Sequence, residues 1–248
     1  MASSTLKAPS SRIASAVRTR IERGGERLWR LEDFRDLPFM AVAQALSRLA
    51  RAGQIERLSK GTYYRSRQTA FGRSRPNPAS IQRLAGRGKP LFPAGIAAAN
   101  LLGFTTQTSA RGELATSASS LPRKLIGPDA VIHTRRPATW KGLSETDAAF
   151  LDFLRRAGRT SELSPEATIR RAISLLSETG RYLRLAGIAE TEPPRVRALL
   201  GALGERLGNH PKAVSKLRES LNPLSRFDFG VFAGLPNARA WQAKERRP

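Results

Sequence analysis

Basic side chains recur at short intervals in the segment QALSRLARAGQIERLSKGTYYR, residues 44–65, and Glu56 is its only acidic residue. The set comprises the cations Arg48, Arg51, Arg57, Lys60 and Arg65, together with the neutral polar residues Gln44 and Ser47. Guanidinium and ammonium groups bind phosphate oxygens, and Gln and Ser hydrogen-bond the edges of bases. These residue types therefore indicate contact with a nucleic acid. We expect the five cations at phosphates, and Gln44 or Ser47 in a groove.

These side chains need a rigid frame, and the local pattern predicts one. Residues 39–52 are predicted to form a helix, with Gly53 as its left-handed stop. The segments QIERL and TYYRS then flank Ser59-Lys60-Gly61, which is typical of a hairpin tip. The apolar stripe of the helix follows the spacing i, i+3, i+4, i+7 and consists of Val42, Ala45, Leu46 and Leu49.

The preceding residues complete the frame. A first helix is predicted from Ser11 as N-cap to a stop at Gly24-Gly25, with Ile13, Val17 and Ile21 as its apolar stripe. A short strand at 28–31 and a short helix at 32–37 follow, before Pro38 starts the next helix. This order is typical of a winged helix-turn-helix, in which the second helix of the pair enters a DNA major groove.

The charge balance agrees with an anionic partner. The 248 residues include 43 basic and 20 acidic ones, which gives a formal net charge of +23. A surplus of this size favours a polyanion, because each neutralised phosphate also releases counterions. A generally basic proteome, in which Arg replaces Lys on solvated surfaces, is the alternative explanation.

Several classes of protein are disfavoured by composition. The absence of cysteine excludes disulfides and thiolate chemistry. No apolar run approaches the roughly 18 residues of a membrane span, and MASSTLKAPSSR at the start lacks the apolar region of a secretory signal. We therefore expect a cytoplasmic protein with no membrane partner.

Residues able to carry catalysis or bind metal are scarce. His133 and His210 are the only histidines and lie in different predicted elements, whereas a zinc site needs three or four ligands. The GRGK of residues 86–89 does not match a phosphate loop. That motif needs a Gly five positions before Gly-Lys and a Ser or Thr after the Lys, and these positions hold Arg83 and Pro90. The DFG of residues 228–230 has no companion kinase motif and is interpreted as a turn. We expect no catalytic residue, no metal and no cofactor.

The rest of the chain divides by composition into three parts. Residues 67–92 are rich in Arg, Pro and Gly, so we predict a linker there, with a turn of helix at 79–85. Residues 236–248 are interpreted as a tail. The predicted elements of 93–235 are a helix at 93–103, strands at 113–118 and 129–136, and helices beginning at Ser144, Ser164, about 181, and Pro193. The predicted fold is α+β and mainly helical, with a winged helix-turn-helix over 1–66 and an α+β domain with a small sheet over 93–235.

Several segments together resemble the AbiEi family of antitoxins of type IV toxin–antitoxin and abortive-infection systems. They are VAQALSRLARAGQIERLSKGTYY, TAFG, LLGFTTQ, EPPRVRALLGALGERLG and LRESLNPLSRFDFG. The resemblance covers most of residues 12–232. It implies that the N-terminal domain binds inverted repeats in the promoter of its own operon and represses it. It also implies that the C-terminal domain counteracts a cognate nucleotidyltransferase-like toxin, directly or indirectly.

One departure from many members of that family lies in the first turn of the third helix. The chain has Pro38-Phe39-Met40 where relatives carry polar residues. Base contacts from that turn would then be apolar, for example with thymine methyl groups, or would fall to Gln44 and Arg48. Two alternatives to the antitoxin remain open, namely a stand-alone winged-helix transcriptional regulator and a basic RNA-binding protein.

Overall fold

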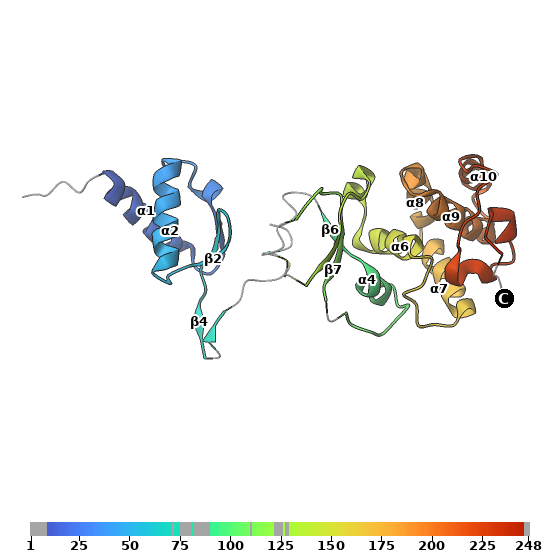
Figure 1. The fold of residues 1–248 in the computed structure, drawn as a ribbon, viewed down its shortest axis with the longest axis horizontal. Coiled ribbons are helices and arrows are strands. Elements are labelled where there is room, and N and C mark those ends of the chain that lie inside the picture. The colour runs from blue at the N-terminus through green and yellow to red at the C-terminus, as the bar shows by residue number, and fades with distance from the viewer. Residues whose placement is uncertain are drawn as a thin grey trace, which may run out of the picture. The chain divides into compact units, whose positions relative to one another are not determined.

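The chain folds into two compact units, which are described separately below (Figure 1). The computed structural model describes residues 9–70, 72–74, 81, 90–109, 111–121, 126 and 129–245. Residues 9–74 belong to the first unit, and residues 90–121 and 129–245 belong to the second. Both units combine helices with small sheets, so the predicted α+β class is confirmed.

The first unit packs two helices against a three-stranded sheet. Its elements are α1 (Pro9–Gly24), β1 (Leu28–Arg30), the 3-10 helix η1 (Leu31–Phe34), α2 (Phe39–Arg51), β2 (Glu56–Ser59) and β3 (Thr62–Tyr64). The strand order is β1-β3-β2, and both pairings are antiparallel. Two predicted boundaries are wrong, because α1 begins before Ser11 and the short helix at 32–37 is a single 3-10 turn that starts at Leu31.

The predicted apolar stripes form the core of the first unit. Val17 of α1 and Leu46 of α2 are both fully buried, and Trp29 and Phe34 close the core from β1 and η1. The rings of Trp29 and Phe34 lie 5.6 Å apart between centroids. Every residue of the predicted α2 stripe is buried, which confirms the helical period assigned to this segment.

An ion pair fixes the connection between the two helices of the first unit. Both terminal nitrogens of Arg20 donate to the carboxylate of Asp36 at 2.6 Å, and Nη1 also reaches the carbonyl of Asp33 at 3.1 Å. The hydrogen bond from Arg20 lowers the pKa of Asp36 to about 2. Asp36 therefore stays ionised down to strongly acid pH, and α1 stays tied to the turn that precedes α2.

Tyr63 and Tyr64 of β3 both lie in the interior of the first unit. Both are buried, because β3 is the central strand and chain segments cover both of its faces. The hydroxyl of Tyr64 donates to Glu26 at 2.6 Å and lies 3.1 Å from the hydroxyl of Ser74. A residue of the predicted linker thus helps to close the first unit.

The predicted linker at 67–92 contains regular structure at both ends. A short hairpin, β4 (Gln68–Thr69) with β5 (Gly72–Arg73), follows the first sheet, and β6 begins at Leu91. The linker prediction is therefore wrong for these residues. The predicted helical turn at 79–85 lies outside the described residues except for Ile81, which is helical.

The second unit packs helices against a small mixed sheet. Its first elements are β6 (Leu91–Pro93), α4 (Gly95–Leu101), β7 (Glu113–Thr116), β8 (Val131–His133), η2 (Ala138–Gly142) and α6 (Glu145–Arg155). The remaining elements are α7 (Pro165–Ser177), α8 (Arg181–Ile188), η3 (Ala189–Thr191), α9 (Pro194–Leu207), α10 (Pro211–Glu219), η4 (Gly230–Gly234) and η5 (Arg239–Trp241). The strand order is β6-β7-β8, with β6 antiparallel and β8 parallel to β7.

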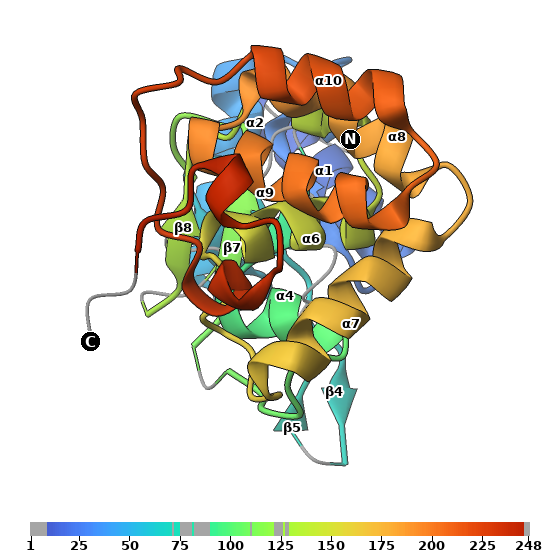
Figure 2. The same cartoon turned by 90° about the vertical axis from the view of Figure 1, so that its right-hand side faces the viewer.

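The helix starts predicted at Ser144, Ser164, about 181 and Pro193 are confirmed, whereas the helix predicted at 93–103 begins at Gly95, because Leu91–Pro93 forms strand β6. The hydroxyl of Ser144 accepts from the amide of Asp147 at 3.1 Å, and Ser164 accepts from Ala167 at 3.2 Å. The apolar residues Val196, Leu199, Leu200 and Leu203 of α9 are fully buried in the unit's own core, and Leu207 is half-buried. Helix α10 was not predicted from the sequence, and it packs beside α9 (Figure 2).

The prediction of a tail at 236–248 is wrong for the described residues 236–245. Trp241 is 1% exposed, and its indole nitrogen donates to Glu205 of α9 at 2.7 Å. The indole lies where a side chain on Gly201 would otherwise stand, because a Cβ there would be 2.0 Å from the ring. Ala243 pairs with Phe227 in an isolated bridge. The C-terminal segment is therefore part of the core of the second unit.

None of the described helices is long and apolar enough to cross a membrane.

We expect Trp241→Ala to destabilise the second unit by about 3–5 kcal/mol, because it removes a large buried ring and leaves a cavity beside α9. Denaturant unfolding followed by circular dichroism measures this loss. Leu224→Ala is the matched control, since Leu224 is 88% exposed and a surface change of this kind stays within about 0.5 kcal/mol. Equal stability of the two variants would mean that the C-terminal segment does not belong to the core.

Candidate nucleic-acid interface

The side of α2 opposite the buried stripe carries the predicted polar residues. Gln44, Arg48 and Arg51 are exposed, and Ser47 is half-buried. Residues 44 and 48, and likewise 47 and 51, are four positions apart and so lie above one another on the helix. The helix thus brings these four residues together on one face, which we call the α2 face.

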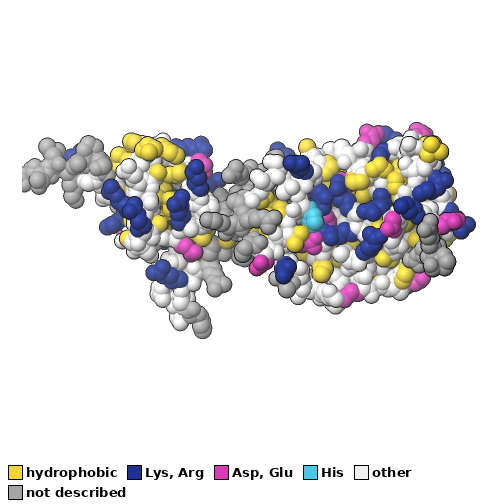
Figure 3. Space-filling view, in the orientation of Figure 1, with side chains coloured by type: hydrophobic (Ala, Val, Ile, Leu, Met, Phe, Trp, Pro, Cys, Tyr) yellow, Lys and Arg dark blue, Asp and Glu magenta, His cyan; other side chains and the backbone are white. Residues whose placement is uncertain are grey.

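The start of α2 is apolar and open to solvent. Phe39 is 64% exposed and Met40 is 68% exposed, although they are among the largest apolar side chains of the first unit. Figure 3 shows hydrophobic side chains gathered at the end of this unit where α2 begins. Met40 precedes Gln44 by four residues, so it extends the α2 face toward the helix N-terminus.

The hairpin holds two further cations of the predicted set. Lys60 is exposed in the turn between β2 and β3, and Gly61 beside it has a φ of +75°. The carbonyl of Gly61 accepts a hydrogen bond from the amide of Leu31 at 3.3 Å, which joins the turn to η1. Arg57 is exposed in β2, next to an irregularity in the pairing with β3. The turn is therefore fixed to the body of the unit.

The four cations of α2 and the hairpin have no internal counter-charge among the described residues. Four described acids of the first unit pair elsewhere, namely Asp36 with Arg20, Glu32 with Arg30, Asp33 with Arg27 and Glu26 with Arg67. The other two, Glu22 and Glu56, form no ion pair with a described cation. Arg48, Arg51, Arg57 and Lys60 form no ion pair with any described carboxylate. Exposed cations without partners are available to bind phosphate.

Arg65 differs from these four cations, because it is half-buried and its guanidinium is hydrogen-bonded within the first unit. Its Nη1 donates to the carbonyl of Ile21 at 2.8 Å and also to that of Glu22. Both carbonyls belong to the last turn of α1, where a helix has unsatisfied acceptors and a negative dipole end. The structure therefore uses this guanidinium to close α1, and the phosphate contact of Arg65 stays a prediction.

Arg18 is a cation that the sequence analysis missed. It is exposed on α1, and together with Arg48 it lines a shallow groove of about 390 Å³ between α1 and α2. The signal was available, because Arg18 lies off the apolar stripe that contains Val17. It extends the unpaired charge of the α2 face across the groove.

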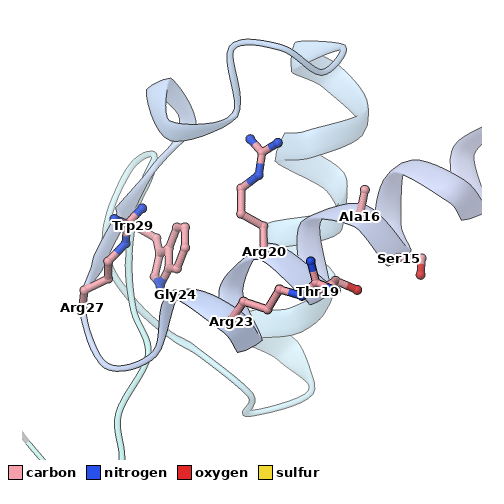
Figure 4. A pocket seen from close by; sticks show the side chains of 8 residues that line it. All are labelled: Ser15, Ala16, Thr19, Arg20, Arg23, Gly24, Arg27 and Trp29. Atoms are coloured by element: carbon pink, nitrogen blue, oxygen red, sulfur yellow. The ribbon is translucent and has the colours of Figure 1, made fainter.

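A second depression in the first unit is basic but largely engaged (Figure 4). It measures about 650 Å³ and lies between the end of α1 and β1. The guanidinium of Arg27 lies over the ring of Trp29 at 3.8 Å, and Arg20 is paired with Asp36. Of the three arginines that line this depression, Arg23 is the one without such a contact to a described residue. The depression therefore has fewer unpaired cations to bind an anion than the α2 face has.

Comparisons with known proteins add no identification. No family model matches the chain, and no curated protein matches it. A crystal structure of the RV2827C protein from Mycobacterium tuberculosis aligns with a TM-score of 0.46 and 16% sequence identity, over 90% of this chain and 85% of that chain. Similarity at this level identifies neither a shared fold nor a function.

The described residues also contain no group of three or more His, Asp or Glu side chains placed to hold a metal ion.

We expect Arg65→Met to lower the stability of the first unit by about 1–3 kcal/mol, since it removes charged hydrogen bonds to the end of α1. Arg48→Met is the matched control, and its effect on stability stays within about 0.5 kcal/mol because Arg48 is exposed and unpaired. Thermal and urea unfolding of the two variants measure the difference. If Arg48→Met proved the more destabilising change, the assignment of the two arginines would be reversed.

Proposed function

We propose that the first unit is a winged helix-turn-helix that binds duplex DNA. The observation that carries this proposal is the exposed, unpaired α2 face in the same unit as a hairpin that bears Arg57 and Lys60. The element order of helix, strand, short helix, helix and hairpin is the order of that motif, with η1 in place of the first helix of the pair. In this arrangement α2 is the recognition helix and the β2–β3 hairpin is the wing.

The chemistry of the α2 face suggests how contacts are divided. In winged helices the start of the recognition helix lies deepest in the major groove, so Phe39 and Met40 would meet thymine methyl groups there. Gln44 and Ser47 follow and supply hydrogen bonds to base edges. Arg48 and Arg51 near the end of α2, with Arg57 and Lys60 on the wing, then neutralise phosphates on either side.

We further propose that the whole chain is an antitoxin that represses its own promoter and opposes a nucleotidyltransferase-like toxin. This part rests on the sequence resemblance to AbiEi antitoxins and not on the fold. The DNA-binding unit would recognise inverted repeats in the promoter. The second unit would counteract the toxin, either by direct contact or through a shared target.

We expect Arg48→Ala and Lys60→Ala each to weaken binding to all DNA sequences at low salt. Each change removes one phosphate contact, so the slope of log affinity against log salt concentration falls by about one unit. Gel shifts with the upstream promoter and with a scrambled duplex, over a series of salt concentrations, measure both quantities.

The control for these variants is Arg206→Ala, which removes one exposed positive charge from α9 of the second unit. It should leave the salt slope unchanged. The absence of any preference of the wild-type chain for its own promoter would reject autorepression, and tighter binding of structured RNA would favour an RNA-binding role.

We expect co-expression of the full chain to restore the growth of cells that express the nucleotidyltransferase-like protein of the same operon. The double variant Arg48→Ala/Lys60→Ala, expressed from an unrelated promoter, should rescue growth equally well, because neutralisation is assigned to the second unit. Colony counts measure the rescue. Absence of rescue by the wild-type chain would reject the antitoxin role while leaving DNA binding intact.

A further inference from the structure

A cluster of arginines surrounds a cavity in the second unit, at the meeting point of β8, α6 and α9. The cavity measures about 280 Å³. We call it the arginine pocket, after four of its lining residues, Arg136, Arg155, Arg156 and Arg195. Figure 3 shows basic side chains gathered around a histidine on the visible face of this unit. None of these residues belongs to the α2 face.

A buried carboxylate holds two of the arginines in place. Asp152 has a fully buried side chain, and its two oxygens accept from Arg136 Nη2 at 2.8 Å and Arg156 Nε at 2.9 Å. The amide of Gly95 also donates to this carboxylate, at 2.9 Å. Burial alone would raise the pKa of Asp152, but the bond from Gly95 and the charge of Arg156 outweigh burial and lower it. Asp152 is therefore ionised near neutral pH and orients two guanidinium groups.

A second buried carboxylate orients the third arginine. Arg155 Nε donates to Glu192 Oε2 at 2.7 Å, and the other oxygen of Glu192 accepts from the indole of Trp140 at 2.7 Å. Arg195 differs from its neighbours, because its only hydrogen bond in the described structure is to the backbone carbonyl of Arg155. No described carboxylate lies within ion-pair distance of Arg195, although Asp228, which pairs with Arg159, is near enough for the charge of Arg195 to help lower its pKa.

The pocket retains positive charge after this pairing. Its four guanidinium groups face three carboxylates, namely Asp152, Glu192 and Glu113, which pairs with Arg156 and with His133. Arg136 Nε is buried and has no hydrogen-bond partner. Burial, which is the largest cause, and then the positive charge of Arg155 lower the pKa of Arg136.

We propose that the arginine pocket binds the phosphoryl group of a small soluble molecule. Planar guanidinium groups with free N–H donors match the oxygens of phosphate, and buried acids already fix three of them in position. The volume lies just below the range of about 300–1,000 Å³ typical of whole-ligand sites. It therefore suits a phosphoryl group better than an entire nucleotide. This assignment is independent of DNA binding by the first unit.

Titration calorimetry of the full chain with inorganic phosphate and with pyrophosphate tests the proposal. Arg195→Gln should weaken the affinity for pyrophosphate by about tenfold or more, because it removes a charged donor. It leaves both buried carboxylates paired, so the melting temperature without ligand should stay close to that of the wild type. Arg195→Lys keeps the charge but loses the planar fork, and should show an intermediate affinity.

Arg206→Gln is the matched control, because it removes the same charge from an exposed, unpaired position of the same helix. Its affinity for pyrophosphate should equal that of the wild type. Absence of saturable binding of both anions to the wild-type chain would overturn the proposal, as would an equal loss in Arg206→Gln. If Arg195→Gln weakened only the binding of duplex DNA, the pocket would contact a nucleic-acid backbone, and the proposal would be wrong.

Discussion

The packing of α2 on α1 is the interaction on which the first unit depends. Leu46 and Val17 are both fully buried at this contact. Because successive residues of a helix are turned by about 100°, burial of one stripe forces the opposite residues outward. Rotation of α2 by a single position would turn Arg48 toward the core. The geometry of the α2 face is thus a consequence of hydrophobic packing, and the Arg20–Asp36 pair restrains the same two helices from the side of the turn.

Elements with strong local signals could be predicted from the sequence. The α2 helix has an unbroken apolar stripe and a glycine stop, and Gly53 adopts the expected positive φ of +68°. The starts of α6 and α7 follow from Ser144 and Ser164, whose hydroxyls bond amides three residues ahead. The exposed polar residues of the α2 face followed from the same periodicity. In each case the determinants lie within one or two turns of the residue concerned.

The errors arose where a side chain finds its partner far along the sequence. Arg65 bonds Ile21 and Glu22, and Trp241 fills the space above Gly201. Nothing near either residue reveals that partner, so the tail was a wrong expectation and the structural bonds of Arg65 could not be predicted. The missed helix α10 has a weak stripe, with Leu217 as its buried residue. The arginine pocket was equally hidden, because its residues come from separate segments that only the fold brings together.

The basic residues behind the net charge of +23 therefore serve different purposes in the structure. Arg65 closes a helix, Arg20 fixes a turn, and Arg136, Arg155 and Arg156 are held by buried acids. These residues are structural in part, and a generally basic proteome would not explain their buried partners. What distinguishes the cations of α2 and the β2–β3 hairpin is the lack of such partners among the described residues, at an exposed surface. The number of unpaired charges, rather than the total, is the quantity that bears on binding a polyanion.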